Sequence, residues 1–470
     1  MFKNIKDKLV QCFIAASIKR IYLRERTRKY NLNNIPEWIC KIIIDINILY
    51  FNNYMMKIGK YSFGIGDRFG HQGEAQLRAI IKALAAGIDI VPVWNKSNRE
   101  HSYIHSKPGD TRVEADAAVS ALSYAGDYFV DADHINLSNV QGFLIASDFF
   151  TLDVANKIGS ASEVERISDF VNSCKKYSGV LNIPGIIHPI EVSDRLIITI
   201  ANKFLAAIAE AGKIYNFIKD QKGAYQFVTE VSMDEVESPQ TPVEMFFILK
   251  MIAEQGIPVQ TIAPKFTGRF NKGVDYEGSI EHFSREFEED ILVIDYAVRE
   301  FGLPENLKLS VHSGSDKFSI YPEIARIIKK YDKGIHVKTA GTTWLEEVTG
   351  LALAGGEALE MAKHIYKTAL DRQGELCAPY ADVIDIKQDK LPLAIEVDKW
   401  GSEKFANSLR HIPGHPDYNP NLRQLIHVGY KIAAESGIEF TGLLEKHHEI
   451  IGSCVEENLF DRHLRRLFEI

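Results

Sequence analysis

The sequence has few cysteines and no long hydrophobic run, and both absences restrict what the protein can be. Its five cysteines are odd in number, widely spaced and without a CxxC pair, which argues against a disulfide framework and favours a reducing compartment. There is no stretch of about 18 apolar residues, the length that spans a bilayer, so we expect no membrane span. These features predict a cytoplasmic protein.

The chain also lacks the common signals for nucleotides and nucleic acids. No GxGxxG or P-loop motif follows the first predicted strand. The formal net charge is −8, so a nucleic-acid partner is not expected. The 470 residues are 46% hydrophobic and 25% charged, which is typical of globular proteins and is enough for one large domain with additions or for two to three average domains.

The first 55 residues contain no glycine and are rich in Ile, Asn, Lys, Arg and Tyr. A signal peptide is disfavoured because the apolar stretch 9–18 runs directly into Lys19 and Arg20 without a cleavage site of small residues. A membrane-surface helix is disfavoured because apolar and basic residues are not segregated. We predict that residues 1–55 are a basic leader, either helical or poorly ordered, without a catalytic part.

From residue 56 onward, apolar runs alternate with helical patterns. The predicted strands are residues 62–66, 88–94, 128–133, 149–154, 224–231, 259–266, 308–312 and 335–338. Between most of them lie predicted helices, at residues 73–86, 111–125, 193–218, 243–255, 279–301 and 320–331. This alternation indicates a parallel sheet, and eight units predict an α/β fold with a closed (β/α)8 TIM-type barrel over residues 56–348. An open doubly wound sheet is the alternative, which the missing dinucleotide motif weakens.

The remainder of the chain, residues 349–470, has a mainly helical pattern. Apolar residues recur at helical spacing over residues 352–371, 399–410, 421–436 and 441–468. We therefore predict additional C-terminal helices that pack on the barrel.

Three histidines lie at or near the ends of predicted strands: His134, His312 and His336. A parallel β/α barrel carries its chemistry at this end of the strands, and three imidazoles can bind one divalent metal. A single histidine in a strand is more often a satisfied core residue. Three at the same end of one barrel favour a metal site, provided that they converge.

Acidic residues accompany these histidines. Asp131 and Asp133 share one face of their predicted strand, next to His134. This grouping suits a metal ligand beside a general base, and the alternative is a turn in which Asp133 caps the following helix. Glu230 ends an otherwise apolar strand, where an acid is costly to bury unless it is paired or functional.

Further polar residues follow the predicted strands and are candidates for substrate binding. They are Asp67, Arg68, Lys265, Arg269, Ser313, Lys338 and Thr339. The basic members suit a small anionic substrate such as a carboxylate or phosphate, and the turns after His312 and Lys338 can present backbone N–H groups to an anion. Each of these residues alone is equally compatible with a solvated loop, but the whole set favours a site.

Several of these motifs resemble those of the tagaturonate/fructuronate epimerase family. The longest are His312-Ser-Gly-Ser-Asp-Lys-Phe-Ser-Ile-Tyr-Pro322 and His336-Val-Lys-Thr-Ala-Gly-Thr342, and shorter ones lie at residues 62–68, 131–134, 150–153, 230–234, 263–266 and 425–431. The resemblance covers roughly residues 62–431. The chain departs from the family pattern in its leader and in the pair Val154-Ala155.

The resemblance implies an isomerase that depends on a divalent metal and acts on a keto-hexonate in hexuronate catabolism. It implies His134, His312 and His336 as the metal ligands, Asp133 as proton acceptor and Glu230 as proton donor. The metal would be Mn, Zn, Co or Ni, the partner a small anionic sugar acid, and a homo-oligomer is compatible with the sequence.

Tagaturonate and fructuronate differ at a carbon β to the ketone, whose C–H is not acidified by an adjacent group. We therefore favour retro-aldol cleavage and re-addition, because oxidation by bound NAD has no dinucleotide motif to support it. The alternative is a metal-dependent aldolase, isomerase or epimerase that acts on another ketose or sugar acid. A barrel that only binds sugar acids is disfavoured because it needs no paired acid and base.

Overall fold

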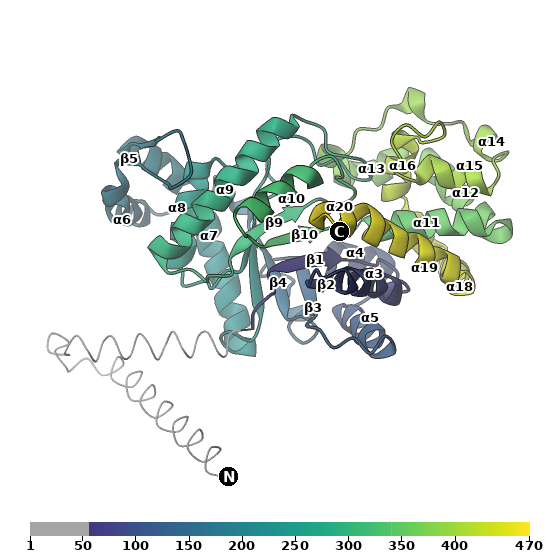
Figure 1. The fold of residues 1–470 in the computed structure, drawn as a ribbon, viewed down its shortest axis with the longest axis horizontal. Coiled ribbons are helices and arrows are strands. Elements are labelled where there is room, and N and C mark those ends of the chain that lie inside the picture. Colours follow the sequence, from purple (N-terminus) through teal and green to yellow (C-terminus); the bar gives the residue numbers. More distant parts are fainter. Residues whose placement is uncertain (1–55, 340) are drawn as a thin grey trace, which may run out of the picture. The chain divides into compact units, whose positions relative to one another are not determined.

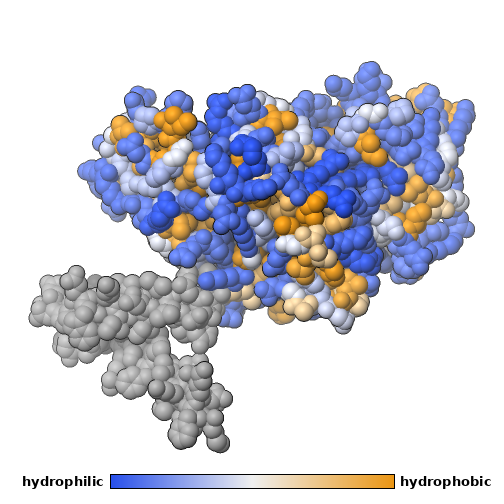
Figure 2. All heavy atoms as spheres, in the orientation of Figure 1, coloured by the Kyte–Doolittle hydropathy of each residue, from blue (hydrophilic) through white to orange (hydrophobic). Residues whose placement is uncertain are grey.

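The computed structural model describes residues 56–339 and 341–470, which fold as one compact unit that begins at Met56. The predicted basic leader, residues 1–55, lies outside the described residues. Within the described part of the chain, no helix is long and apolar enough to cross a membrane. Hydrophilic side chains cover most of the face drawn in Figure 2, with hydrophobic patches between them.

Eight parallel strands close into a barrel at the centre of this unit (Figure 1). They are β1 (Tyr61–Ile65), β2 (Ile90–Ser97), β3 (Phe129–Ile135), β4 (Phe149–Asp153), β7 (Val228–Ser232), β8 (Thr261–Ala263), β9 (Lys308–His312) and β10 (Ile335–Lys338). The order around the barrel is β1-β10-β9-β8-β7-β4-β3-β2, so the first and last strands pair and close it. The predicted TIM-type barrel is confirmed.

Helices connect the strands and cover the barrel. They are α3 (Gly73–Ala85), α4 (Asn98–Ile104), α5 (Pro108–Ala121), α7 (Asp194–Lys222), α8 (Pro242–Glu254), α9 (Ile280–Phe301) and α10 (Tyr321–Lys330). Local sequence sets several of their starts: Ser97 and Thr241 form capping boxes with Glu100 and Glu244, which satisfy free N–H groups of the first turn. These caps fix where the chain leaves the barrel mouth and turns into α4 and α8.

The connection between β4 and α7 contains structure that the sequence pattern did not predict. It holds α6 (Val164–Cys174) and a small antiparallel pair, β5 (Gly179–Leu181) and β6 (Ile190–Val192). Strands of three residues are too short to show a period of two, which explains why they were missed.

Short 3₁₀ turns occupy Val140–Gly142, Ala155–Lys157, Lys175–Tyr177, Ala378–Val383 and Gln388–Lys390.

The C-terminal part is helical, as predicted, but is divided into shorter helices. They are α11 (Thr342–Ala354), α12 (Gly356–Asp371), α13 (Gln373–Cys377), α14 (Ala394–Val397), α15 (Ser402–Leu409), α16 (Pro420–Val428), α17 (Tyr430–Glu435), α18 (Ile438–Lys446), α19 (His448–Glu457) and α20 (Arg465–Phe468). A π-helical turn, Asn458–Leu464, joins α19 to α20. Helix α11 crosses the predicted boundary at residue 348 and packs against α15 and α19.

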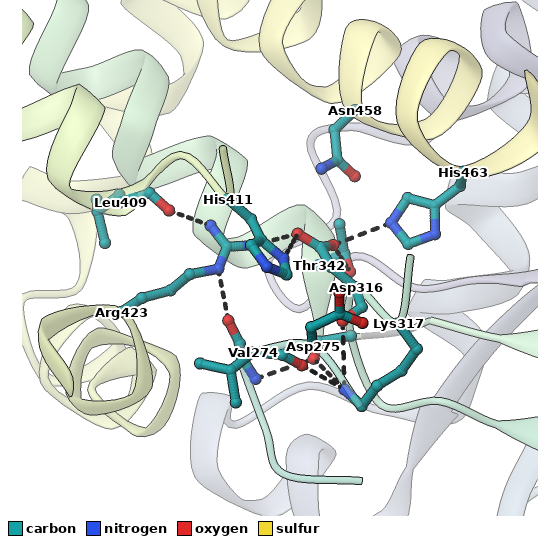
Figure 3. Close-up of polar contacts among 12 residues, drawn as sticks. Val274, Asp275, Asp316, Lys317, Thr342, Leu409, His411, Arg423, Asn458 and His463 are labelled. Atoms are coloured by element: carbon teal, nitrogen blue, oxygen red, sulfur yellow. Dashed lines mark hydrogen bonds and ion pairs between the residues drawn. The ribbon is translucent and has the colours of Figure 1, made fainter. Parts of the chain in front are cut away.

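A buried carboxylate ties this helical extension to the barrel (Figure 3). Asp316 lies in the loop after β9 and has no exposed surface. It accepts hydrogen bonds from Arg423 Nη2 on α16 at 2.7 Å and from His463 Nε2 on the π-helical turn at 3.0 Å. Thr342 Oγ1 and His411 Nδ1 complete the set at 3.1 and 3.3 Å. Segments separated by up to 147 positions therefore meet at one side chain.

We expect Arg423→Met to destabilise the protein by about 3–5 kcal/mol, because it leaves the buried Asp316 without its guanidinium partner. Urea unfolding of the purified variant measures this loss. Arg372→Met is the matched control: it removes an arginine that pairs with the exposed Glu375 and Glu435, and we expect it to cost about 0–1 kcal/mol. Equal losses in the two variants would contradict the role of Asp316.

Candidate active site

A β-bulge near the end of β3 turns His134 toward the barrel mouth. The register between β3 and β4 shifts between Ala132 and Ile135, and His134 has a left-handed φ of 52°. Regular alternation would point His134 away from the face that Asp133 occupies. The bulge instead brings its ring to 5.2 Å from the ring of His312 at the end of β9.

Lys338, at the end of β10, lies among three buried carboxylates. Its ammonium Nζ is 2.7 Å from Asp131, 2.9 Å from Asp133 and 2.9 Å from Glu230. Thr151 Oγ1 lies 2.5 Å from the same Nζ and also hydrogen-bonds to Asp131. One lysine therefore holds together the acids of β3 and β7 inside the barrel.

The unequal surroundings of these acids separate their pKa values. Burial raises the pKa of Asp131 to about 7; the charge of Lys338 opposes this rise, and the charges of Asp133 and Glu230 add to it. Burial also disfavours the charged form of Asp133, but the charges of Lys338 and the nearby histidines lower its pKa to about 2. Asp133 is thus an ionised carboxylate near neutral pH, as a general base requires.

A second cluster combines His134, Asp234 and His312. One ligand atom from each residue lies within 4.8 Å of the others, a spacing that suits a single metal ion. Nδ1 of His312 is 3.1 Å from Asp234, but neither this atom nor Nδ1 of His134 has a hydrogen-bond partner within the described structure. Nε2 of His312 lies 2.8 Å from Glu230, the arrangement in which a carboxylate orients a metal-binding imidazole.

His336 lies outside this cluster, so the structure does not bring together the three histidines of the predicted ligand set. It is two positions before the end of β10, fully buried, with its ring 5.4 Å from Phe149 and Nδ1 2.9 Å from Ser62 Oγ. His336 therefore belongs to a deeper layer of the barrel interior than His134 and His312. Asp234, two positions beyond β7, takes the place in the cluster that we had expected for His336.

A cavity of about 320 Å³ opens over both clusters. Its lining includes five of the predicted site residues: Arg68, Asp133, His134, His312 and Lys338. Glu230 has no exposed surface and is not part of the lining. Its contacts with Lys338 and His312 place it behind the cavity wall.

The other predicted substrate-binding residues make contacts elsewhere. The carboxylate of Asp67 accepts the backbone N–H groups of residues 69–72 before α3. Ser313 and Thr339 hydrogen-bond to the backbone carbonyls of Lys338 and Gly64. Lys265 and Arg269 do not line the cavity; Arg269 reaches Asp385 at 3.5 Å.

Among the cavity residues that were not assigned a role from the sequence are Arg99, Asp234, Lys272 and His427. Asp234 and His427 lie inside the quoted family motifs, which was the available signal. Arg99 lies in the first turn of α4 and Lys272 in the loop after β8, and in both places many polar residues follow one another. Nothing in the local pattern distinguishes the residue that reaches the cavity from its solvated neighbours.

The fold and the site define a class: a TIM-barrel enzyme that performs acid–base chemistry on a small ligand held at the barrel mouth. The model of the tagaturonate epimerase family matches residues 5–467, and the chain belongs to that family. It is accordingly a carbohydrate epimerase, an enzyme of the isomerase class. The match begins at residue 5, so it includes most of the segment that we expected to depart from the family.

Comparisons with individual proteins agree with this assignment. A tagaturonate/fructuronate epimerase of Thermotoga maritima is 30% identical over 387 residues, which cover 78% of this chain and 72% of that protein. A glycerol complex of the fructuronate-tagaturonate epimerase from Cohnella laeviribosi shares the fold, with 22% identity, a TM-score of 0.73 and coverage of 89% of this chain and 85% of that chain. The native structure of the same enzyme gives a TM-score of 0.70 at 22% identity, covering 90% and 85%.

The buried His336 should make stability depend on pH. Burial, with the charge of Lys338 adding to it, lowers the pKa of His336 to about 3. The unfolded chain takes up this proton below its ordinary pKa of about 6.5, so stability is present above that pH and is lost as the pH falls towards 3. We expect His336→Gln to remove about 2–3 kcal/mol of the wild-type loss between roughly pH 7 and pH 4.5.

Urea unfolding at a series of pH values measures this difference. His364→Gln is the matched control, because His364 is exposed on α12 and its loss should leave the wild-type pH profile in place. A His336→Gln profile parallel to the wild-type profile would show that His336 does not titrate on unfolding.

Proposed function

We propose that this chain interconverts D-tagaturonate and D-fructuronate in the cytoplasm. The observation that carries this proposal is the ionised carboxylate of Asp133, which lines the cavity between Lys338 at 2.9 Å and the ring of His134. It is a general base next to a cluster that suits a metal, in a chain of the tagaturonate epimerase family. The named relatives supply the choice of substrate pair.

We infer that a divalent cation, one of Mn, Zn, Co or Ni, is bound by His134, Asp234 and His312. The imidazole and carboxylate donors suit these metals, and support comes from the Nδ1 atoms of both histidines, which are buried and form no hydrogen bond within the described residues. When bound, such a cation supplies Lewis-acid polarisation of substrate oxygens. Glu230, hydrogen-bonded to Nε2 of His312, would hold that ring in the ligating orientation.

Asp133 would start the epimerisation by taking the proton from the hydroxyl group on the carbon to be inverted. The C–C bond between that carbon and its neighbour next to the ketone then breaks. Its electron pair moves toward the ketone, and an aldehyde is left. Rotation of the aldehyde and re-addition through its other face inverts the centre, and Asp133 returns the proton to the new alkoxide. This route avoids removal of a C–H proton that no adjacent group acidifies.

Lys338 connects the buried Glu230 to the cavity. Glu230 does not reach the cavity itself, but its carboxylate is 2.9 Å from the ammonium of Lys338, which does. The ammonium is the cation closest to Asp133 and would stabilise negative charge that develops on the substrate. Burial opposes the charged form of Glu230, but the charges of Lys338 and His312 lower its pKa well below the ordinary value. The ionised Glu230 would therefore hold Lys338 in position and would not act as the proton donor that we expected.

Metal removal should abolish turnover. A chelator-treated enzyme should lose tagaturonate–fructuronate interconversion and regain it with Mn, Zn, Co or Ni.

Because Asp234 lies in the ligand cluster, Asp234→Asn should lower metal affinity roughly 10-fold or more, whereas His336→Gln should retain the metal. Elemental analysis and product assays measure both effects. Full activity of the stripped enzyme would refute metal dependence, and loss of metal in His336→Gln alone would restore the three-histidine set.

Asp133→Asn should keep the metal and lose turnover, because the amide cannot accept the hydroxyl proton. We expect kcat to fall about 10²- to 10⁴-fold, with metal content unchanged by elemental analysis. Asp153→Asn is the matched control: this carboxylate also lines the cavity but lies 3.9 Å from His134 on the other side. A larger loss in Asp153→Asn than in Asp133→Asn would reassign the base.

A further inference from the structure

Four cationic side chains line the cavity, and two of them are already neutralised. Arg68 pairs with Glu100 at 3.1 Å, and Lys338 pairs with its three carboxylates. Arg99 and Lys272 also line the cavity, and within residues 56–339 and 341–470 neither has a side-chain hydrogen bond or ion pair; the Arg99 guanidinium lies 5.0 Å from the centre of the Tyr380 ring. These two are the cations that remain available to an anionic ligand.

The backbone around Lys272 is held from both sides. Lys317 Nζ, which is buried, donates hydrogen bonds to the carbonyls of Asn271 at 3.0 Å and of Val274 at 2.7 Å. The N–H of Lys272 donates to the carbonyl of Val383 at 2.7 Å. The residue is therefore fixed in place although it lies in a long loop, and only its side chain is uncommitted.

Gly273, the residue after Lys272, connects this loop to the buried Asp316 through Arg423. Arg423, the partner of Asp316, also donates through Nε to the carbonyl of Gly273 at 2.6 Å. Ser315 Oγ accepts the N–H of Gly273 at 2.9 Å. The position of Lys272 thus depends on the same contacts that join the barrel to the helical extension.

Gly314 leaves room for the Lys272 ammonium. It lies in the β9–α10 loop with a left-handed φ of 65°, and a Cβ atom there would be 2.9 Å from Lys272 Nζ. A side chain at this position would therefore displace the ammonium. Burial lowers the pKa of Lys272, and the charges of Glu235 and Asp234 oppose that effect, but within the described residues neither carboxylate forms an ion pair with the Lys272 ammonium.

His427 lies at the same end of the cavity. It is 2% exposed, lines the cavity, and its Nδ1 has no partner within the described structure. Burial and the charges of Arg68 and Lys272 hold the pKa of His427 well below its ordinary value. Its neutral ring can exchange a hydrogen bond with a ligand that Lys272 binds.

The Lys338 end of the cavity is unsuitable for a substrate carboxylate. A further negative charge there would meet Asp131, Asp133 and Glu230, all within 2.9 Å of the single ammonium. Like charges at such distances repel one another strongly in a buried site. The sugar must therefore place its hydroxyl end near Asp133 and its anionic end elsewhere.

We propose that Lys272, flanked by Arg99 and His427, is the subsite that binds the carboxylate of the sugar acid and selects acids over neutral ketoses. This inference rests on the proposed function, because it assumes that the substrate is a keto-hexonate. It orients the substrate across the cavity, with the carboxylate at Lys272 and the reacting hydroxyl at Asp133. Lys272 is then the residue that sets the substrate class.

The test compares D-tagaturonate with D-tagatose, which carries a CH₂OH group in place of the carboxylate. Dissociation constants of both ligands are measured by calorimetry on the metal-loaded wild type and on Lys272→Met. We expect the variant to bind tagaturonate roughly 10- to 100-fold more weakly, as for loss of a hydrogen bond to a charged group, and tagatose within about twofold of wild type. KM for tagaturonate should rise more than kcat falls.

Lys265→Met is the matched control, because Lys265 lies in the same loop but does not line the cavity, and it should leave both constants unchanged. Lys272→Arg keeps the charge and should recover most of the binding of tagaturonate. Equal weakening of both ligands, or an unchanged ratio in Lys272→Met, would overturn the subsite. A wild type that binds tagaturonate but does not convert it would refute the proposed function and leave the subsite intact.

Discussion

The buried carboxylate of Asp316 is the constraint on which the arrangement of this enzyme depends. It has no exposed surface, so its charge must be satisfied within the protein, and its partners Arg423 and His463 come from the far end of the chain. The hydrogen bonds of Arg423 and His463 to Asp316 hold the helical extension against the loop that follows β9. This loop follows His312 and contains Gly314, which lies against Lys272. The same contacts therefore position both the cluster of His134, Asp234 and His312 and the end of the cavity near Lys272.

Lys338 imposes a similar electrostatic constraint inside the barrel, where three buried carboxyl groups surround its ammonium group. Three acids around one ammonium cannot all be ionised at equal cost, and the surroundings resolve this by raising the pKa of Asp131 while lowering that of Asp133. Two carboxyl groups on one strand, two positions apart, therefore differ in pKa. Both contact Lys338, but Asp133 also lies beside His134 and His312, whose charges lower its pKa.

The sequence predicted the eight barrel strands because each is an apolar run of adequate length at the start of a repeated unit. It also placed Asp133, His134, His312 and Lys338 at the mouth, since strand ends meet there in any such barrel. The position of Asp234 beside His134 and His312 was not predicted, because it depends on a bulge at His134 and on a contact across the barrel. The strand of His336 was predicted with its observed bounds, 335–338. The sequence does not show that a residue two positions before the end of this strand lies deeper in the barrel than His134 and His312.

The division of the site between early and late parts of the chain has a consequence for its synthesis. The barrel strands are complete at Lys338, but the cavity also needs Tyr380 and His427, and Asp316 needs His463. A ribosome-bound chain can assemble the strands while these residues are still untranslated. Until they are made, the barrel would hold an unmatched buried charge at Asp316 and a cavity without part of its lining.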